Sequence, residues 1–343
     1  GLIHDLDLDR ELRWLDSKVG FLHDGKLYPF VTPWDLLRFQ PLSLLDRLRL
    51  GLVGMHLRRT SRWEELEPFT AAEWIIQHLG QRNYDVVWGP LLRGKFGASY
   101  AEVGMVWFWG KIRLRFASRR GPLQREVLGY LEGSFGRLVG GMKRRIQAAG
   151  GIIHTQSPVA RVEVEEWRVA GVKAEGEAAG GHPCQAVVAT VANPIFAAMA
   201  PFPEEYRQKL GMVRYQGAAC LVLVMNKRLS PFYWLNISDA SVAFVAAIEH
   251  TNFLPPERYG GKHILYLSNY LDPESPLFRM NAEELFRHYS PHLKTINPDF
   301  DPSWVEECHL FKDPFAQPVI TTNYSAKMPP LDTPISGLYL ANT

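Results

Sequence analysis

The clearest pattern of hydrophobic and polar positions lies between residues 133 and 193. Apolar residues recur at helical spacing from residue 138 to residue 149, and Gly150-Gly151 follows, which predicts a helix that ends at a left-handed glycine. Short β-branched runs come next, separated by turn residues. The last run, residues 186–192, is almost wholly apolar, as expected of a strand covered on both faces. The pattern therefore predicts a helix followed by strands of a buried sheet.

Before this stretch the pattern is mainly helical, apart from one hairpin. Asp24-Gly25 separates two apolar runs, and this dipeptide is a strong signal for a tight turn between paired strands. Ser43 precedes an apolar-periodic segment and predicts the start of a long helix. Thr70 opens a capping box, which predicts a second helix ending near Gly80.

After residue 195 the pattern changes to strands joined by long turns, with one helix opened by Asn281, and this order predicts an α+β layer. His288 and His292 lie four residues apart, but Pro291 is expected to disrupt the helix that would align them on a metal ion. No metal site is therefore predicted. The expected strands cover residues 218–225, 242–249, 264–269 and 304–311.

The order of these elements resembles a known family. A glycine-rich turn at residues 131–135, a helix ending in Gly-Gly, a strand that begins Ser157-Pro158-Val159, a hairpin at residues 168–172 and the apolar strand at 186–190 provide the resemblance. They are similar to the middle of FAD-dependent amine oxidase and protoporphyrinogen oxidase-like flavoproteins, a group that includes phytoene desaturases. The resemblance implies a fold of mixed α/β and α+β class with an FAD-linked reductase-like two-domain architecture.

The resemblance also implies domain boundaries and cofactor positions. A partial FAD-binding domain is combined with a substrate domain of helices and an antiparallel or mixed sheet. By position, Val159 would lie beside the adenine of FAD, and Thr190 and Ala192 would contact the cofactor; the alternative for Val159 is a core valine in a hairpin. The implied parts are residues 1–132 (helical part of the substrate domain), 133–195 (inserted FAD-binding portion), 196–336 (substrate-domain sheet) and 337–343 (start of a closing FAD-domain strand).

The phosphate-binding signals are weak. No Gly-x-Gly-x-x-Gly occurs, and the spacing from Gly89 to Lys95 resembles a phosphate-binding loop, but Phe96 occupies the position of the magnesium-binding hydroxyl. We expect residues 89–96 to form a substrate-domain loop. The chain begins within a helical pattern and finishes on a strand pattern, which suggests a piece of a longer protein. FAD is accordingly expected in the full-length protein, and this piece is expected to be colourless or at most weakly yellow.

Candidate substrate-pocket residues lie where polar groups interrupt the expected strands. A pocket for a small molecule needs an apolar lining with a few placed polar groups. His250 and Tyr324 are the candidates for catalysis, with a structural histidine at a strand end as the favoured alternative for His250. The pocket candidates are Trp234, Asn236, His250, Asn269, Asn323 and Tyr324.

Composition narrows the class of partner. The chain is 46% hydrophobic and its formal charge is +2, which fits a globular protein of about two domains and gives no field for nucleic acid. Three widely spaced cysteines indicate neither a disulfide framework nor a zinc site. The absence of a signal peptide or membrane span predicts a cytoplasmic protein.

Two basic segments leave alternatives open. The helix after Ser43 is apolar and carries several arginines, so it either packs in a helical layer, which we favour, or rests on a membrane surface. Residues 111–120 interleave basic and apolar side chains, which fits a phosphate-facing groove or, more commonly, an element with one wet face.

The expected activity is hydride transfer from a substrate C–H bond to flavin. Many amine oxidases of this family carry a lysine on the first strand of the substrate domain, and residues 217–225 have none. Dehydrogenation of an apolar, lipid-like or isoprenoid substrate, and a flavin-dependent isomerase or mutase reaction, are therefore retained. A cofactor-free binding module is the alternative from another class. A Gly-x-Gly-x-x-Gly motif upstream would support the oxidoreductase, and a natural start near Gly1 would support the binding module.

Overall fold

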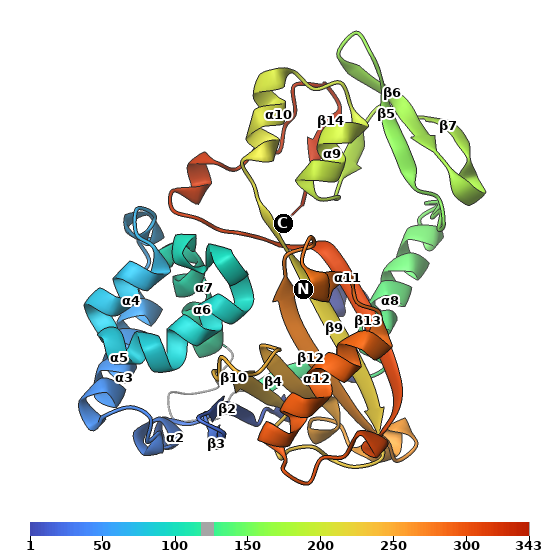
Figure 1. Ribbon diagram of the computed structural model, residues 1–343. Coiled ribbons are helices and arrows are strands. Elements are labelled where there is room, and N and C mark those ends of the chain that lie inside the picture. Colours follow the sequence, from blue (N-terminus) through green and yellow to red (C-terminus); the bar gives the residue numbers. More distant parts are fainter. Residues whose placement is uncertain (118–126, 343) are drawn as a thin grey trace. The chain divides into compact units, whose positions relative to one another are not determined.

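The computed structural model describes residues 1–117 and 127–342, and the chain divides into two compact units (Figure 1). Unit 1 comprises residues 1–14, 129–214 and 325–343, and unit 2 comprises residues 15–128 and 215–324. Helices and strands are mixed in both units, so the predicted fold class is confirmed. Each unit is therefore assembled from stretches that are far apart in the sequence.

Unit 1 includes the N-terminal residues because their side chains pack on its long helix. Leu8 is buried and lies next to Gly141, and the Arg137 guanidinium donates to the Glu11 carboxylate. The resemblance instead implied that these N-terminal residues belong to the helical part of the substrate domain. The elements of unit 1 are α1 (Leu2–Asp5), β1 (Leu12–Asp16), β4 (Val127–Leu131), α8 (Ser134–Ala148), β5 (Val159–Glu165), β6 (Arg168–Ala174), β7 (Gly180–Pro183), β8 (Val187–Ala189), α9 (Asn193–Met199), α10 (Glu204–Gly211) and β14 (Leu338–Leu340). The division between the units falls inside β1 and β4, which contribute residues 12–14 and 129–131 to unit 1.

The strands of unit 1 form small sheets. β5, β6 and β7 make an antiparallel sheet, β8 pairs in parallel with β14, and β1 pairs with β4. As predicted, α8 is followed by the left-handed Gly150. The prediction that residues 186–192 form a strand covered on both faces is wrong: β8 covers only three of these residues, and Val188 is 62% exposed. An apolar run alone does not show how many faces other elements cover.

Unit 2 combines a helical layer with a mixed sheet. The sheet has seven strands in the order β13-β9-β12-β11-β10-β2-β3, in which only the β10–β2 pair is parallel. The elements are β2 (Val19–His23), β3 (Lys26–Pro29), α2 (Pro33–Arg38), α3 (Leu44–Arg59), α4 (Ala71–Leu79), α5 (Gln81–Asn83), α6 (Gly89–Phe96), α7 (Met105–Ala117), β9 (Tyr215–Met225), β10 (Trp234–Ile237), β11 (Ala246–Glu249), β12 (His263–Leu271), α11 (Pro276–Arg279), α12 (Ala282–Ile296) and β13 (Val305–Pro318).

Two cores hold unit 2 together. One gathers the buried side chains of α3, α4, α6 and α7 around residues such as Ile75 and Phe96. The other places the apolar face of α12, including Tyr289 and Leu293, against the inward side chains of β9, β10 and β12. The sheet is therefore packed on one face by α12, while α6 contacts β10 and β12.

Local turn and capping predictions are confirmed in unit 2. Asp24 and Gly25 both have positive φ at the β2–β3 turn, as the mirror-image turn of a tight hairpin requires. The side chains of Ser43, Thr70 and Asn281 each accept the backbone N–H three residues on and open α3, α4 and α12. These motifs depend on neighbouring residues only, which makes them readable from sequence.

Two local predictions are wrong. Residues 89–96 form helix α6 instead of a loop, because Gly89 and Pro90 occupy a helix N-terminus where the proline ring fits. Helix α12 continues through Pro291 to Ile296, because Leu285, Tyr289, Leu293 and Ile296 are all buried against the sheet. Tertiary burial outweighs the loss of one backbone hydrogen bond at the proline.

Helix α3 has two apolar faces, which explains why its sequence left alternatives open. Leu50 and Leu57 are buried in the helical layer, as favoured, whereas Leu45 and Leu52 on another face are 79% and 63% exposed. Of the basic tract at residues 111–120, residues 111–117 belong to α7 and the remainder lies outside the described residues. No helix in the described ranges 1–117 and 127–342 has the length and apolar character needed to cross a bilayer.

Candidate substrate-binding site

A cavity of about 280 Å³ lies within unit 2, between helices α6 and α7 and the sheet. Its lining is mostly aromatic and aliphatic, with a few polar groups, which is the usual composition of a small-molecule site. The lining residues are Phe21, Phe30, Val87, Trp88, Pro90, Leu91, Leu92, Lys95, Trp107, Phe108, Lys111, Ile112, Arg115, Trp234, Asn236, Ile237, Val245, Ala246, Ser268 and Tyr270.

Strand alternation sets the floor of the cavity. Ser268 and Tyr270 occupy alternate positions of β12, so their side chains lie on one face of the sheet. In the register, Asn236 of β10 pairs with Ala246 of β11, which pairs in turn with Ser268. These three residues therefore form one cross-strand row below α6.

Lys95 supplies the most unusual charge in the cavity. Its Nζ donates a hydrogen bond of 2.7 Å to the Tyr270 hydroxyl and lies 3.9 Å from the centroid of the same ring. Burial lowers the pKa of Lys95 to about 8. Among the residues that the structure describes, no carboxylate forms an ion pair with Lys95. A cationic–aromatic contact thus takes the place of a counter-ion.

Further hydrogen-bond donors surround the same space. The Lys111 Nζ lies 5.6 Å from the centroid of the Trp107 ring, and the Lys95 Nζ lies 5.9 Å from it. The pKa of Lys111 is lowered, first by its apolar surroundings and second by the positive charge of Lys95. The indole Nε1 of Trp88 is buried and has no acceptor in the described part of the chain. The lining therefore offers donors and positive charge, and none of the described lining residues is acidic.

Two of the predicted pocket residues line this cavity. Trp234 and Asn236 come from alternate positions of β10, and the Trp234 Nε1 donates to the Asn236 Oδ1 at 3.1 Å. The Asn236 Nδ2 donates to the Gly20 carbonyl at 3.2 Å. Because its amide is engaged on both sides, Asn236 fixes the floor and orients Trp234.

His250 and Asn269 lie outside the lining. The His250 Nε2 is 2.6 Å from the Tyr259 hydroxyl, and burial lowers the pKa of His250. The Asn269 Nδ2 donates to the Tyr289 hydroxyl at 3.0 Å and to the Ala243 carbonyl at 2.7 Å, on the α12 side of the sheet. Asn269 is next to Tyr270 in sequence, so strand alternation turns it away from the cavity.

Asn323 and Tyr324 follow the last strand of unit 2 and are also absent from the lining. The Asn323 backbone N–H donates to the Glu67 carbonyl at 2.9 Å. Burial raises the pKa of Tyr324 to about 12. A phenol with this pKa stays neutral and can only donate or accept a hydrogen bond at ordinary pH.

The cationic residues of the cavity were not predicted from the sequence. Lys95 belongs to a segment that only partly matches a phosphate-binding loop, and Lys111 is one of several basic residues in its segment. A usable signal existed at Tyr270, since Leu267, Asn269 and Leu271 share one parity along the strand and Ser268 and Tyr270 share the other. That alternation assigns Asn269 to the core face.

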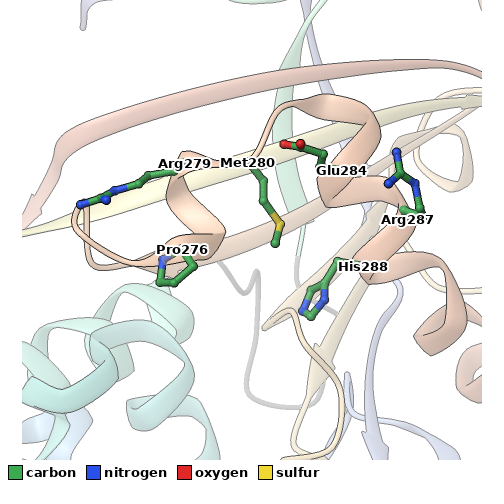
Figure 2. A pocket seen from close by; sticks show the side chains of 6 residues that line it. All are labelled: Pro276, Arg279, Met280, Glu284, Arg287 and His288. Carbon is green, nitrogen blue, oxygen red and sulfur yellow. The ribbon is translucent and has the colours of Figure 1, made fainter.

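A second hollow, of about 500 Å³, lies between α11 and the start of α12 (Figure 2). Met280 and His288 extend into the same space, whereas Arg279 forms an ion pair with Glu274 at 2.8 Å and Glu284 caps its own helix at the Asn281 N–H. Two of its charged groups thus serve local structure, so this shallow hollow is a weaker candidate than the cavity.

One group of potential metal ligands is brought together at the β2–β3 turn. His23, Asp24 and Asp239 place ligand atoms within 4.8 Å of one another. The Asp239 carboxylate, however, accepts the backbone N–H groups of Asp24 and Gly25 at 2.6 and 2.9 Å. These bonds explain its position as a clamp on the hairpin turn.

Comparison with solved structures reveals the fold. An oxidoreductase from Methanosarcina mazei is 18% identical, with a TM-score of 0.71 over 99% of this chain and 78% of that one. An Exiguobacterium protein assigned as a protoporphyrinogen oxidase is 15% identical, with a TM-score of 0.70 over 99% and 78%. A UDP-galactopyranose mutase is 13% identical, with a TM-score of 0.67 over 94% and 71%. The chain has the fold of FAD-dependent amine oxidase-like flavoproteins.

Comparison by sequence found no relative of the chain, whereas comparison by structure did. No family model matches the chain, and no curated protein matches it. The resemblance inferred from the order of elements is confirmed at the level of fold. The identities of 12–18% do not carry over a substrate or an activity.

The predicted cofactor residues of this flavoprotein-like chain lie in unit 1. Val159 begins β5 and is 39% exposed, Thr190 follows β8 and is exposed, and Ala192 precedes α9. The Asn342 Nδ2 donates to the Val191 carbonyl at 2.7 Å and fixes the backbone next to Ala192. Exposed apolar and backbone groups of this kind fit the adenine part of FAD, whereas the sequence lacks the glycine-rich loop that binds a pyrophosphate.

Proposed function

We propose that this chain holds the substrate of an FAD-dependent oxidoreductase. The observation that carries the proposal is the aromatic cavity of unit 2, in a fold shared with an oxidoreductase and a putrescine oxidase. FAD, when bound, would accept a hydride from a substrate C–H bond. Val159 would lie beside its adenine, and Thr190 and Ala192 are the other residues that would contact it.

The residues of the cavity define what the protein itself contributes. Trp88, Trp107 and Trp234 form apolar walls that exclude water and hold a flat or aliphatic substrate body. The Tyr270 hydroxyl accepts from Lys95 and can donate its own proton to a substrate acceptor. The positive charges of Lys95 and Lys111 disfavour a cationic amine, so we propose a non-amine substrate with an apolar body.

An isomerase or mutase reaction of the flavin is the second candidate. The cluster of Lys95, Lys111 and Arg115 at the cavity favours it, because a substrate of that class can carry phosphate groups. A cofactor-free binding module would use the same cavity without flavin. The two flavin reactions differ in outcome, since an isomerisation leaves the flavin with no net change in oxidation state.

Anaerobic mixing of the FAD-loaded full-length protein with a panel of amines, porphyrinogens and polyenes tests the proposal. We expect the visible flavin absorbance to bleach with a porphyrinogen or a polyene and to remain with amines such as putrescine. Bleaching by amines alone would contradict the proposed substrate class. Conversion of a substrate without bleaching would favour the isomerase, and binding without a requirement for FAD would favour the binding module.

A further inference from the structure

We propose that the cavity of unit 2 binds the acidic group of an amphipathic substrate, with Lys95 and Lys111 as its cationic partners and the tryptophan walls holding the apolar body. The inference deepens the proposed function, because it names the chemical class that the same site takes. It rests on the proposed function only for the statement that this ligand is a substrate.

The lining of the cavity carries positive charge with no carboxylate among its described residues. A lysine taken out of water without a carboxylate partner is energetically unfavourable, and its lowered pKa reflects that cost. Lys111 lies against the same Trp107 ring, so its positive charge adds to the cost. An anion that entered between the two ammonium groups would offset the free-energy cost of burying both charges.

Hydrogen-bond donors at the cavity outnumber the acceptors that the described residues offer them. The Lys95 ammonium has three N–H donors, and among the described residues it has one oxygen acceptor, the Tyr270 hydroxyl. The buried Trp88 Nε1 adds a donor with no acceptor among the described residues. Carboxylate and phosphate oxygens accept such donors with short, charge-assisted bonds.

The rest of the cavity lining is mainly apolar. Phe21, Phe30, Leu91, Phe108 and Ile112 offer no polar group to a ligand. The remainder of the ligand must therefore be apolar, and a volume of about 280 Å³ suits a fused-ring or branched hydrocarbon body. An inorganic anion would leave these walls without a partner.

Isothermal titration of the 343-residue chain with 2-naphthoic acid, 2-naphthamide and 2-naphthyl phosphate tests the inference. We expect the acid to bind at least about tenfold more tightly than the neutral amide of the same shape. The phosphate arm distinguishes the two anions that share this chemistry. Equal affinity for acid and amide, or no binding of either anion, would overturn the inference.

Substitutions identify the cationic partners. Lys95→Met should weaken the acid about tenfold and leave the amide within about twofold, whereas Lys95→Arg should retain most of the preference for the acid. Lys294→Met, which removes an exposed lysine from α12, is the matched control for net charge. An unchanged acid affinity in Lys95→Met would exclude Lys95 from the site.

The pH profile adds an independent readout. Since the pKa of Lys95 lies at about 8, the affinity for the acid should fall as the pH rises through 8, while that for the amide stays level. Lys111 and Arg115 of α7 and Tyr270 of β12 are the other ionisable groups at the cavity, and burial raises the pKa of Tyr270. The binding measurements use no flavin, so their failure is separable from a failure of the redox proposal.

A second proposal rests on a different surface: we propose that the outer face of α3 docks on an anionic lipid bilayer. Leu45, Leu48, Leu52 and Met55 recur at three- and four-residue spacing, so they form one stripe along the helix, and all four are exposed. The neighbouring α2 adds the exposed Trp34. This stripe is additional to the buried face that holds α3 in the helical layer.

Charge selects the occupant of this surface. Residues 33–59 contain five arginines and two aspartates. Arg47 is half-buried and donates to the Leu37 and Leu42 carbonyls, whereas the other four arginines, Arg38, Arg49, Arg58 and Arg59, are exposed. Both aspartates are engaged at helix starts, where the Asp35 carboxylate accepts the Thr32 N–H and the Asp46 carboxylate accepts the Ser43 hydroxyl. An apolar stripe with basic residues beside it is the pattern of a helix that lies in a lipid interface.

Co-sedimentation with phosphatidylglycerol/phosphatidylcholine vesicles and with pure phosphatidylcholine vesicles tests the second proposal. We expect binding to the anionic vesicles that is weakened about tenfold by the double change Leu45→Ser and Leu52→Ser. Leu331→Ser, at a position that is 68% exposed in unit 1, is the control. No binding to anionic vesicles would overturn the proposal, as would a dimer in gel filtration that the same double change dissociates.

Discussion

Replacing Glu249 with alanine is expected to lower the free energy of unfolding of unit 2 by about 3 kcal/mol. Glu249 is 1% exposed, and its two carboxylate oxygens accept the backbone N–H groups of Leu229 and Ser230 at 2.9 and 2.7 Å. The Ser230 hydroxyl donates to the same carboxylate at 3.2 Å. Alanine removes the acceptor of three buried donors, and each unsatisfied donor costs free energy.

Urea unfolding followed by tryptophan fluorescence measures this loss. Glu257→Ala, at an exposed position in the same unit, should stay within about 0.5 kcal/mol of the parent. Burial raises the pKa of Glu249, so the stability it contributes is greatest below the ordinary pKa of a glutamate and declines as the pH rises through the raised value. The difference between parent and Glu249→Ala should therefore narrow from acidic to neutral pH. If the difference in unfolding free energy between the parent and Glu249→Ala stayed constant with pH, the raised pKa of Glu249 would be contradicted.

Replacing Gly104 with alanine is expected to destabilise unit 2 by about 3 kcal/mol, because a methyl group there meets backbone. An added Cβ would lie 2.6 Å from the Thr321 carbonyl oxygen. The residues on either side of Gly104 are buried, and the Gly104 N–H donates to the Ile320 carbonyl at 2.7 Å. Moving either backbone segment away would therefore cost buried contacts or this hydrogen bond. The displacement would also shift the start of α7, which holds Trp107 and Lys111 at the cavity.

Gly110→Ala is the matched control for this steric effect. Gly110 lies inside α7, and outside its own helix backbone no atom of the described residues lies within 4 Å of an added Cβ, so the same substitution should stabilise the helix by about 0.5–1 kcal/mol. Opposite signs at the two positions are the expected result of thermal or urea unfolding. A Gly104→Ala protein as stable as the parent would show that the loop near Thr321 yields easily.

The candidate site illustrates why charges were harder to predict than turns. Lys95 and Tyr270 are 175 residues apart in the sequence, and their contact exists only because α6 packs on β12. Neither residue lies in a motif that chemistry requires at fixed spacing. Trp234 and Asn236 were predictable as a pair because strand alternation places both on one face of the sheet. The position of α6 decided that this face lines the cavity.

The sequence by itself determined the elements whose cause is local. The Asp24-Gly25 turn and the N-caps at Ser43, Thr70 and Asn281 form because a side chain or a positive φ satisfies its nearest backbone groups. The order of these elements was enough to identify the fold. Only the tertiary structure decided that α12 continues through Pro291, that Val188 is exposed and that α3 has an uncovered stripe, because burial depends on partners distant in the sequence. The same dependence on distant partners places Lys95 against an aromatic ring in a cavity with no described acidic residue.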